Sequence, residues 1–263
     1  VMLGRVQRNI KQAAAQLSEN GYAVVDALLG PPWAAVLPKA FEQMAHDMEN
    51  HFTSGELELT GQSHKKTRGD KILWLDGLDA KHPLPSQLTQ LLQKTVGAVL
   101  SSELNQRGEQ PPLADTSGVI ADSMFAMYSP CEGGFVRHLD NAGQDDLRRV
   151  SAVYYLSDCS HGQGGELVLY PESSEWDEED ANDEEGAAGV YCGKTKNGIS
   201  VVPRIDRLVL FWSNKVPHEV IALTEDAPES RMALSYWYRS RLSSSMMDEA
   251  LSPLRDYVEG HIE

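Results

Sequence analysis

Cysteine is scarce in this chain, and its scarcity argues against a disulfide-stabilised fold. Only three cysteines occur among the 263 residues, Cys131, Cys159 and Cys192, and no two of them form a CxxC pair. An odd number of widely spaced cysteines does not suit a disulfide framework and is typical of a reducing compartment. We therefore expect a cytoplasmic or nuclear protein.

Positive charge is also in short supply. Lys and Arg total 23 against 39 Asp and Glu, which gives a formal net charge of −16. Because phosphate contacts require a basic surface, this balance argues against a nucleic-acid partner and against an anionic membrane surface. Nine of the acids lie in residues 172–185 without a single base, and we expect this stretch to be a solvated loop.

Long apolar runs are missing as well. No segment approaches the roughly 20 apolar residues of a membrane-spanning helix. Residues 1–11 lack the apolar core and cleavage site of a secretory signal. We therefore expect a chain with no membrane partner and no secretory signal. With 41% hydrophobic and 24% charged residues, it has the composition of a globular domain.

Apolar residues recur at helical spacing in the first part of the chain. The pattern predicts helices over residues 6–17, 32–52 and 87–104, with a short strand over residues 22–27. Polar residues predict an irregular connection over 53–68, and residues 105–118, rich in Pro and Gly, predict a second connector.

Short β-rich runs follow one another after Gly118. Eight short strands separated by turn residues predict an antiparallel sandwich or barrel. Because the helices come first and the strands after them, we expect an α+β fold with the helices packed on one face of a sheet. The predicted strands span residues 119–128, 134–138, 150–156, 166–170, 199–202, 208–212, 219–223 and 232–238.

These patterns together predict a single domain over residues 1–263. Residues 1–118 would form a mainly helical support, and residues 119–240 would form the β-rich core. The acidic stretch, taken as residues 172–189, would be an insertion between two strands. Residues 241–263 would form a C-terminal tail or helix.

The residues of chemical interest lie in the β-rich half. In a strand, residues i and i+2 point to the same face, so His138 and Asp140 can converge on one point. His218 opens another predicted strand, and two histidines with one carboxylate form the ligand set of non-haem Fe(II) oxygenases. Zinc accepts the same donors and is the chemical alternative. Arg231 begins a later strand, where its guanidinium could hold a carboxylate through two hydrogen bonds.

An HxD pair by itself occurs by chance in many chains, and the order of the motifs makes it informative. The HxD pair, a strand-borne histidine and an arginine one strand later all fall in the β-rich half. The other six histidines lie mostly in helices or polar loops, and we expect them at the surface: His46, His51, His64, His82, His161 and His261.

In this order the chain resembles the Fe(II)- and 2-oxoglutarate-dependent dioxygenases, whose core is a double-stranded β-helix, or jelly roll. Within them it resembles the oxygen-sensing prolyl hydroxylases that act on hypoxia-inducible factor, and the protist enzymes that act on the Skp-type adaptor of SCF ubiquitin ligases. The matching segments run in family order: Thr67–Ile72, Tyr128, Phe135–Asn141, Tyr154–Leu156, Gly164–Leu167, Asp206–Leu208, Phe211–Ser213, Pro217–Val220, Arg231 and Trp237–Tyr238.

The resemblance implies 4-hydroxylation of a proline, with Fe(II), 2-oxoglutarate, O2 and ascorbate as cofactors and cosubstrates. It implies that His138, Asp140 and His218 bind the iron. Arg231 would pair with the distal carboxylate of 2-oxoglutarate, helped by the phenol of Tyr155.

The resemblance also implies further residues around these groups. Tyr128 would hydrogen-bond near the cosubstrate, while Leu167 and Val220 would wall its pocket, although both also suit an ordinary core. Trp237 would offer an apolar wall to the substrate, and the charges of Arg148 and Asp70 at the rim would meet its flanks. The positions that match substrate contacts are Asp70, Met124, Phe135, Arg148 and Trp237, and the neighbouring Arg149 leaves the register of Arg148 open by one residue.

The resemblance leaves two proteins as candidates for the substrate. The acidic insertion and residues 141–147 depart from the pattern of the animal hypoxia-factor hydroxylases, which favours the Skp-type adaptor over a hypoxia-factor-like degron. Collagen-type prolyl hydroxylases usually carry Lys in place of Arg231 and are secretory, and nucleic-acid demethylases carry a second Arg in place of Trp237. A jelly-roll metal-binding module without activity is the alternative from a different class, and it would form no succinate from 2-oxoglutarate.

Overall fold

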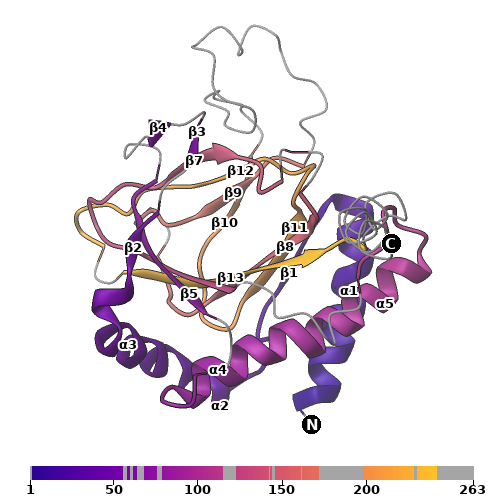
Figure 1. Cartoon of the computed structure of the whole chain (residues 1–263), viewed down its shortest axis with the longest axis horizontal. Helices are drawn as coiled ribbons and strands as arrows, with labels where there is room; N and C mark the ends of the chain where they lie inside the picture. Colours follow the sequence, from indigo (N-terminus) through magenta and orange to yellow (C-terminus); the bar gives the residue numbers. More distant parts are fainter. Residues whose placement is uncertain are drawn as a thin grey trace, which may run out of the picture.

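The computed structural model describes residues 2–55, 58–59, 62–63, 68–75, 79–114, 123–141, 143, 146–160, 162–171, 198–227 and 230–241. It shows two antiparallel sheets with helices along one side (Figure 1). The α+β arrangement predicted from the sequence is therefore confirmed. The acidic insertion at 172–189 and the predicted tail beyond Arg241 lie outside the described residues.

The larger sheet has seven strands, and every neighbouring pair in it is antiparallel. Its central strands are almost wholly buried, and every residue of the strand Leu208–Trp212 is buried. In spatial order the strands are β1 (Tyr22–Val25), β11 (Leu208–Trp212), β8 (Arg148–Tyr155), β13 (Arg231–Arg239), β6 (Ser123–Tyr128), β5 (Asp70–Leu75) and β2 (Thr53–Ser54).

The smaller sheet faces the larger one, and side chains of both sheets line a common pocket. Its strands, in spatial order, are β10 (Ile199–Val201), β9 (Leu167–Leu169), β12 (His218–Val220) and β7 (Phe135–His138). The ladder between β12 and β7 changes register between His218 and Val220. A separate two-stranded ribbon pairs β3 (Glu58–Leu59) with β4 (Gln62–Ser63).

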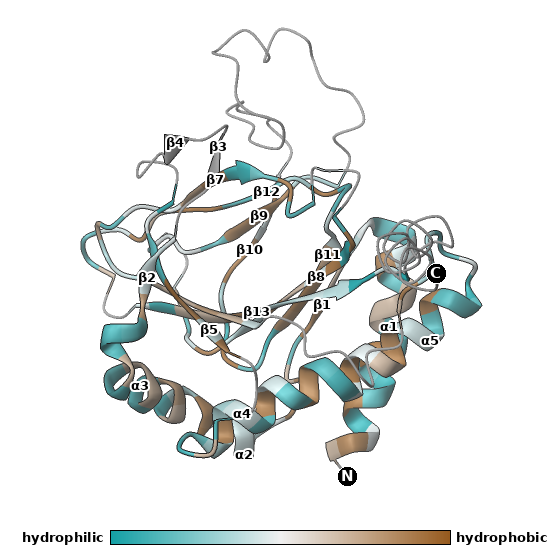
Figure 2. Cartoon of the chain, viewed as in Figure 1, coloured by the Kyte–Doolittle hydropathy of each residue, from teal (hydrophilic) through white to brown (hydrophobic). Residues whose placement is uncertain are grey.

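The helices pack against the larger sheet and one another. The buried residues of α1 recur at helical spacing, and α1 contacts β1, β11 and α5. In Figure 2 the helices carry mixed polar and apolar residues, as expected for elements with one buried side. The helices are α1 (Met2–Asn20), α2 (Pro31–Ala34), α3 (Leu37–Asp47), α4 (Pro83–Gln90) and α5 (Gly97–Gln106), with a π-helical turn at Leu91–Val96 and a 3-10 turn at Glu49–His51.

Two predicted helices differ from those observed. The helix predicted over 32–52 is two helices, because Pro38 lacks an N–H and fits only the first turn of α3. The helix predicted over 87–104 begins earlier, at Pro83, where a proline again occupies the first turn. Proline therefore sets the start of both helices.

Strand β5 is the main element that the sequence analysis missed. It pairs with β6 along its whole length, from Asp70 opposite Tyr128 to Leu75 opposite Ser123. The short strand β2 and the ribbon of β3 and β4 also lie within residues 53–68, predicted as irregular. Strand propensity depends strongly on the neighbouring strand, and β6 lies some fifty residues further along the chain.

Asp206 joins the helical side of the molecule to the larger sheet. Its buried carboxylate accepts hydrogen bonds from the backbone N–H groups of Leu29 (2.9 Å) and Gly30 (2.6 Å) and from the Tyr154 phenol (2.8 Å). Tyr154 thus turns away from its neighbour Tyr155, whose phenol lies beside Arg231. This contact fixes the start of α2 against β8.

Candidate active site

Two histidines of the smaller sheet lie opposite each other in adjacent strands. His138 ends β7, His218 begins β12, and the two residues are direct cross-strand partners. Their Nδ1 atoms lie 2.8 Å from the Val136 carbonyl and 3.2 Å from the Val216 carbonyl. Because a carbonyl only accepts hydrogen bonds, each Nδ1 must carry the proton. Both Nε2 atoms therefore present a lone pair to the pocket.

Asp140 completes a compact group of three ligand atoms. Its Oδ1 lies 3.5 Å from Nε2 of His138 and 3.6 Å from Nε2 of His218. Among the described residues, these three side chains form the one group of His, Cys, Asp or Glu that could hold a metal ion. Their donor atoms lie within 4.8 Å of one another, and the set of two imidazoles and one carboxylate suits Fe(II).

The electrostatics of this group favour the protonation states that metal binding needs. Burial alone would raise the pKa of the Asp140 carboxyl. The electrostatic influence of His218 and His138 and the hydrogen bond from the Ser151 hydroxyl outweigh burial, so the pKa of this carboxyl lies well below its usual range. Burial, together with the neighbouring His138, lowers the pKa of His218 to about 4. At neutral pH the carboxylate is thus ionised and the His218 imidazole neutral, as in a ligand set.

Arg231 lies at the buried end of the same pocket. It begins β13, opposite Tyr128 of β6. Its Nε donates to the Gly165 carbonyl (2.8 Å), and its Nη2 donates to the Tyr155 phenol (3.4 Å). The guanidinium lies 5.0 Å from the ring centroids of both Tyr128 and Tyr155. These partners supply no negative charge, so the geometry suits an incoming carboxylate.

Ten of the thirteen residues singled out in the sequence line this pocket. They are His138, Asp140, His218, Arg231, Tyr128, Leu167, Val220, Met124, Phe135 and Trp237. Leu167 and Val220 are buried apolar residues of the same lining as the metal-ligand group and Arg231. Tyr155, Asp70 and Arg148 are not in the lining, and Tyr155 reaches it only through its hydrogen bond to Arg231.

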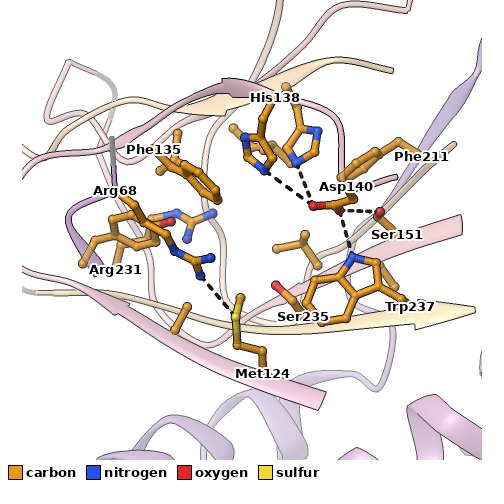
Figure 3. Close-up of a pocket in the computed structure, with 17 residues that line it drawn as sticks. Arg68, Met124, Phe135, His138, Asp140, Ser151, Phe211, Arg231, Ser235 and Trp237 are labelled. Carbon is orange, nitrogen blue, oxygen red and sulfur yellow. Dashed lines mark hydrogen bonds and ion pairs between the residues drawn. The ribbon is translucent and has the colours of Figure 1, made fainter. Parts of the chain in front are cut away.

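Asp70 is buried rather than placed at the rim, contrary to the expectation from the sequence. Both its carboxylate oxygens accept hydrogen bonds from Arg68, at 2.5 and 2.8 Å. Burial, with the nearby Asp70 charge, raises the pKa of the Tyr128 phenol. Arg68, not Asp70, faces the pocket, where its guanidinium lies 3.2 Å from the Met124 sulfur and 4.6 Å from the Phe135 ring centroid (Figure 3).

Trp237 lines the pocket, and Trp74 and Arg148, which lie beside its ring, define with it what we call the pocket mouth. Trp74, at 54% exposure, lies 6.0 Å from the Trp237 ring. The half-exposed Arg148 lies 5.7 Å from the same ring and pairs with Asp146. Arg149 is buried over Trp212 instead. Arg148, not Arg149, therefore lies beside Trp237.

Three residues of this region carried no assigned role in the sequence analysis. Arg68 stood inside a matching segment, but only the fork with Asp70 directs it to the pocket. Trp74 shares a face of β5 with Asp70 and Ile72, a placement that becomes visible only once this segment is recognised as a strand. Ser151 is a buried serine in an apolar strand, where an unexpected hydroxyl indicates a specific partner.

Comparisons with known proteins agree with this geometry. Residues 123–239 match the family described as the 2OG-Fe(II) oxygenase superfamily. Residues 123–239 therefore carry a 2OG-Fe(II) oxygenase domain. A domain of this family implies Fe(II), 2-oxoglutarate and O2. The residues present fit these groups, because two imidazoles and a carboxylate lie together and a buried guanidinium lines the same pocket.

The oxygenase domain is similar to several prolyl hydroxylases. Egl nine homolog 1 of Homo sapiens is 29% identical over 233 residues, covering 84% of this chain and 44% of that protein. Hypoxia-inducible factor prolyl hydroxylase of Caenorhabditis elegans is 27% identical over 258 residues, covering 95% of this chain. The match covers 30% of the Caenorhabditis elegans protein. The chain therefore spans less than half the length of each of these two relatives.

A solved structure shows the same fold. The prolyl hydroxylase of Trichoplax adhaerens, in complex with a hypoxia-inducible factor peptide fragment, has a TM-score of 0.63 and 24% identity. The match covers 90% of this chain and 92% of that one. The jelly-roll core expected from the sequence is therefore confirmed. No helix among the described residues has the length and apolarity to span a membrane.

Proposed function

We propose that this oxygenase domain 4-hydroxylates a proline of a protein substrate, with 2-oxoglutarate and O2 as cosubstrates and Fe(II) held by His138, Asp140 and His218. The observation that carries the proposal is the placement of this three-residue group and the buried Arg231 in one pocket that Trp237 also lines. Similarity to prolyl hydroxylases supports proline as the target.

The residues of the pocket divide the work of binding and orientation. When bound, Fe(II) supplies the chemistry that converts 2-oxoglutarate, O2 and a C–H group to succinate, CO2 and an alcohol. Arg231, with Tyr155, would hold the distal carboxylate of 2-oxoglutarate. Leu167 and Val220 would exclude water beside it, which strengthens the ion pair.

The mouth of the pocket suits an extended proline-containing segment. Proline has a fixed φ, so such a segment loses less conformational freedom when it binds a groove. Trp237 and the exposed Trp74 offer flat apolar surfaces to a pyrrolidine ring, and Arg148 and Arg68 offer cations to the flanking residues.

For the substrate we propose the Skp-type adaptor of SCF ubiquitin ligases, in the cytoplasm or nucleus. Its support is the departure of residues 141–147 and of the acidic stretch from the animal hypoxia-factor hydroxylases. A hypoxia-factor-like degron is the second candidate, favoured by the names of the relatives. Ascorbate would sustain repeated turnover by keeping the iron reduced.

A direct competition between the two substrates tests this proposal. The protein is incubated with Fe(II), 2-oxoglutarate and equal amounts of adaptor and degron peptide, and mass spectrometry follows the gain of one oxygen on proline. Faster modification of the adaptor is the expected result, and faster modification of the degron reverses the order. Peptides with Ala in place of Pro are the matched controls. Succinate formation with neither peptide modified would overturn both substrates, and failure to consume 2-oxoglutarate would favour a metal-binding module.

A further inference from the structure

The two carboxylate oxygens of Asp140 have different surroundings. Oδ1 faces both histidine Nε2 atoms, at 3.5 and 3.6 Å. Oδ2 accepts hydrogen bonds from the Ser151 hydroxyl at 2.5 Å and from the Trp237 indole N–H at 2.9 Å. Figure 3 shows both donors on the side of Asp140 away from the imidazoles. One oxygen is thus left for a metal while the other is held by the protein.

A second serine orients the first. Ser213 Oγ lies 2.9 Å from Ser151 Oγ, and both hydroxyls are buried, with residue exposures of 0% and 1%. A carboxylate that ligates a metal is ionised and can only accept, so the single Ser151 proton must point to Asp140. Ser213 must then donate to Ser151. The two hydroxyls form a chain with one proton direction.

Asp140 needs such support because no ladder holds it. Strand β7 ends at His138, two residues earlier. The backbone after Asp140 is tied instead to Ser213, whose carbonyl accepts from the Asn141 N–H at 3.0 Å and whose own N–H donates to the Arg149 carbonyl at 3.0 Å. Ser213 therefore supports both the backbone beside Asp140 and, through Ser151, its side chain.

We infer that Ser151, oriented by Ser213 and acting with Trp237, is a positioning residue that directs Oδ1 of Asp140 to the metal. This inference rests on the metal centre in the proposed function. Partners of this kind hold a ligand in its binding geometry, and their removal commonly weakens metal binding by about 10- to 100-fold. The same magnitude is expected for Ser151→Ala, because the charge-assisted bond to Oδ2 is lost.

Co(II) binding to the purified chain, without 2-oxoglutarate or peptide, tests the inference. The dissociation constant and the visible absorption spectrum of bound Co(II) are measured for wild type and four variants. Ser151→Ala is expected to bind more weakly with an altered spectrum, and Ser151→Thr, which keeps the hydroxyl, to restore both. Ser213→Ala should show a smaller loss. Ser101→Ala is the matched control, since Ser101 is a buried serine of α5 whose hydroxyl donates to the Leu113 carbonyl at 3.3 Å.

The outcomes separate this inference from the proposed function. If wild type and Ser101→Ala bind no Co(II), the proposed metal centre is overturned. If wild type binds and Ser151→Ala binds equally well with the same spectrum, the positioning role is overturned. Should Ser151→Ala fail to fold, Ser213→Ala decides, because it leaves the Ser151–Asp140 contact in place. Unchanged affinity in that variant contradicts the hydroxyl chain.

Discussion

The buried end and the mouth of the pocket are built in different ways. At the buried end, Arg231 and the two tyrosines beside it belong to three strands of the larger sheet, and all three residues are buried. At the mouth, Trp74 is 54% exposed and Arg148 is half-exposed beside Trp237. The buried end suits one small charged ligand, whereas the mouth offers area to a larger partner.

Electrostatics should therefore dominate at the buried end and contact area at the mouth. A desolvated charge that loses its partner costs about 2–5 kcal/mol, whereas an ion pair at the protein surface contributes roughly 0–1 kcal/mol, and Arg148 and Asp146 form a pair that is only partly buried. Substitutions at the two ends should accordingly differ both in size and in which substrate they affect.

The largest effect is expected from substitutions of the three metal ligands in the pocket. His218→Ala removes one of three donors, so turnover should fall at least roughly 1,000-fold, because the chemistry belongs to the bound metal. Succinate formation and Co(II) binding measure the loss, and circular dichroism checks that the fold is kept. A variant with full activity would remove His218 from the metal site.

The next largest effect separates the two ends directly. Arg231→Ala should raise the KM for 2-oxoglutarate by roughly 30-fold or more, the equivalent of at least 2 kcal/mol, while the peptide KM changes little. Arg231→Lys keeps the charge without the fork and should fall between. If both KM values rose equally in Arg231→Ala, the residue would have a general structural role instead.

A smaller effect of the opposite kind is expected at the mouth. Trp74→Ala removes an exposed aromatic wall and should raise the peptide KM by about 5- to 10-fold, since truncated aromatic contacts commonly cost 1 kcal/mol or more. The KM for 2-oxoglutarate should stay near that of wild type. Leu3→Ala is the matched control, because Leu3 is similarly exposed on α1. A rise in both KM values would contradict a separate mouth.

The smallest effect is expected on the stability of the helical region, where His82, just before α4, contacts Asp79 and α3. His82 lies against Asp79 (Nδ1 to Oδ2, 2.5 Å) and Asp47 of α3 (Nε2 to Oδ2, 3.2 Å). Hydrogen bonding to Asp79 and, secondarily, to Asp47 raises the pKa of His82 despite burial. Hydrogen bonds from His82 lower the pKa values of Asp47 and Asp79. The fold thus favours the protonated, charged form of His82 and the ionised forms of Asp47 and Asp79.

The sign of the pH dependence follows from these directions. A raised His82 pKa contributes stability that is complete below about pH 6.5, the ordinary value, and is lost as the pH rises through the folded-state value. The carboxylates contribute above their ordinary pKa and lose this contribution as the pH falls through the lowered values. Urea unfolding at pH 6 and pH 9 should show a smaller difference in His82→Gln than in wild type. An equal difference would contradict the contact.

The same contrast explains how far the sequence predicts the structure. His138 and Asp140 are two residues apart at the end of a strand, and Arg231 begins another, so local spacing already indicates that they point inward. The mouth depends on the pairing of β5 with β6, which no local pattern reveals. Asp70 was accordingly expected at the rim, although its fork with Arg68 buries it.

The local sequence also does not predict which polar residues are buried or which residues they contact. The sequence places His82 in a polar context, and it was expected at the surface, but α3 and the turn before α4 enclose it at 8% exposure. The partners of Ser151 are likewise separated from it in sequence, by 11 residues for Asp140 and 62 for Ser213. Such contacts arise from tertiary packing, which periodicity does not encode.

The most direct test of the account is the stoichiometry of turnover. With Fe(II), O2 and a proline peptide that the protein modifies, succinate and hydroxylated proline are quantified in the same reaction. One hydroxyproline formed per succinate, with both products lost in His218→Ala, is the predicted result. Succinate that forms at the same rate with and without every proline peptide tested, and no oxygen gained on proline, would contradict a prolyl hydroxylase.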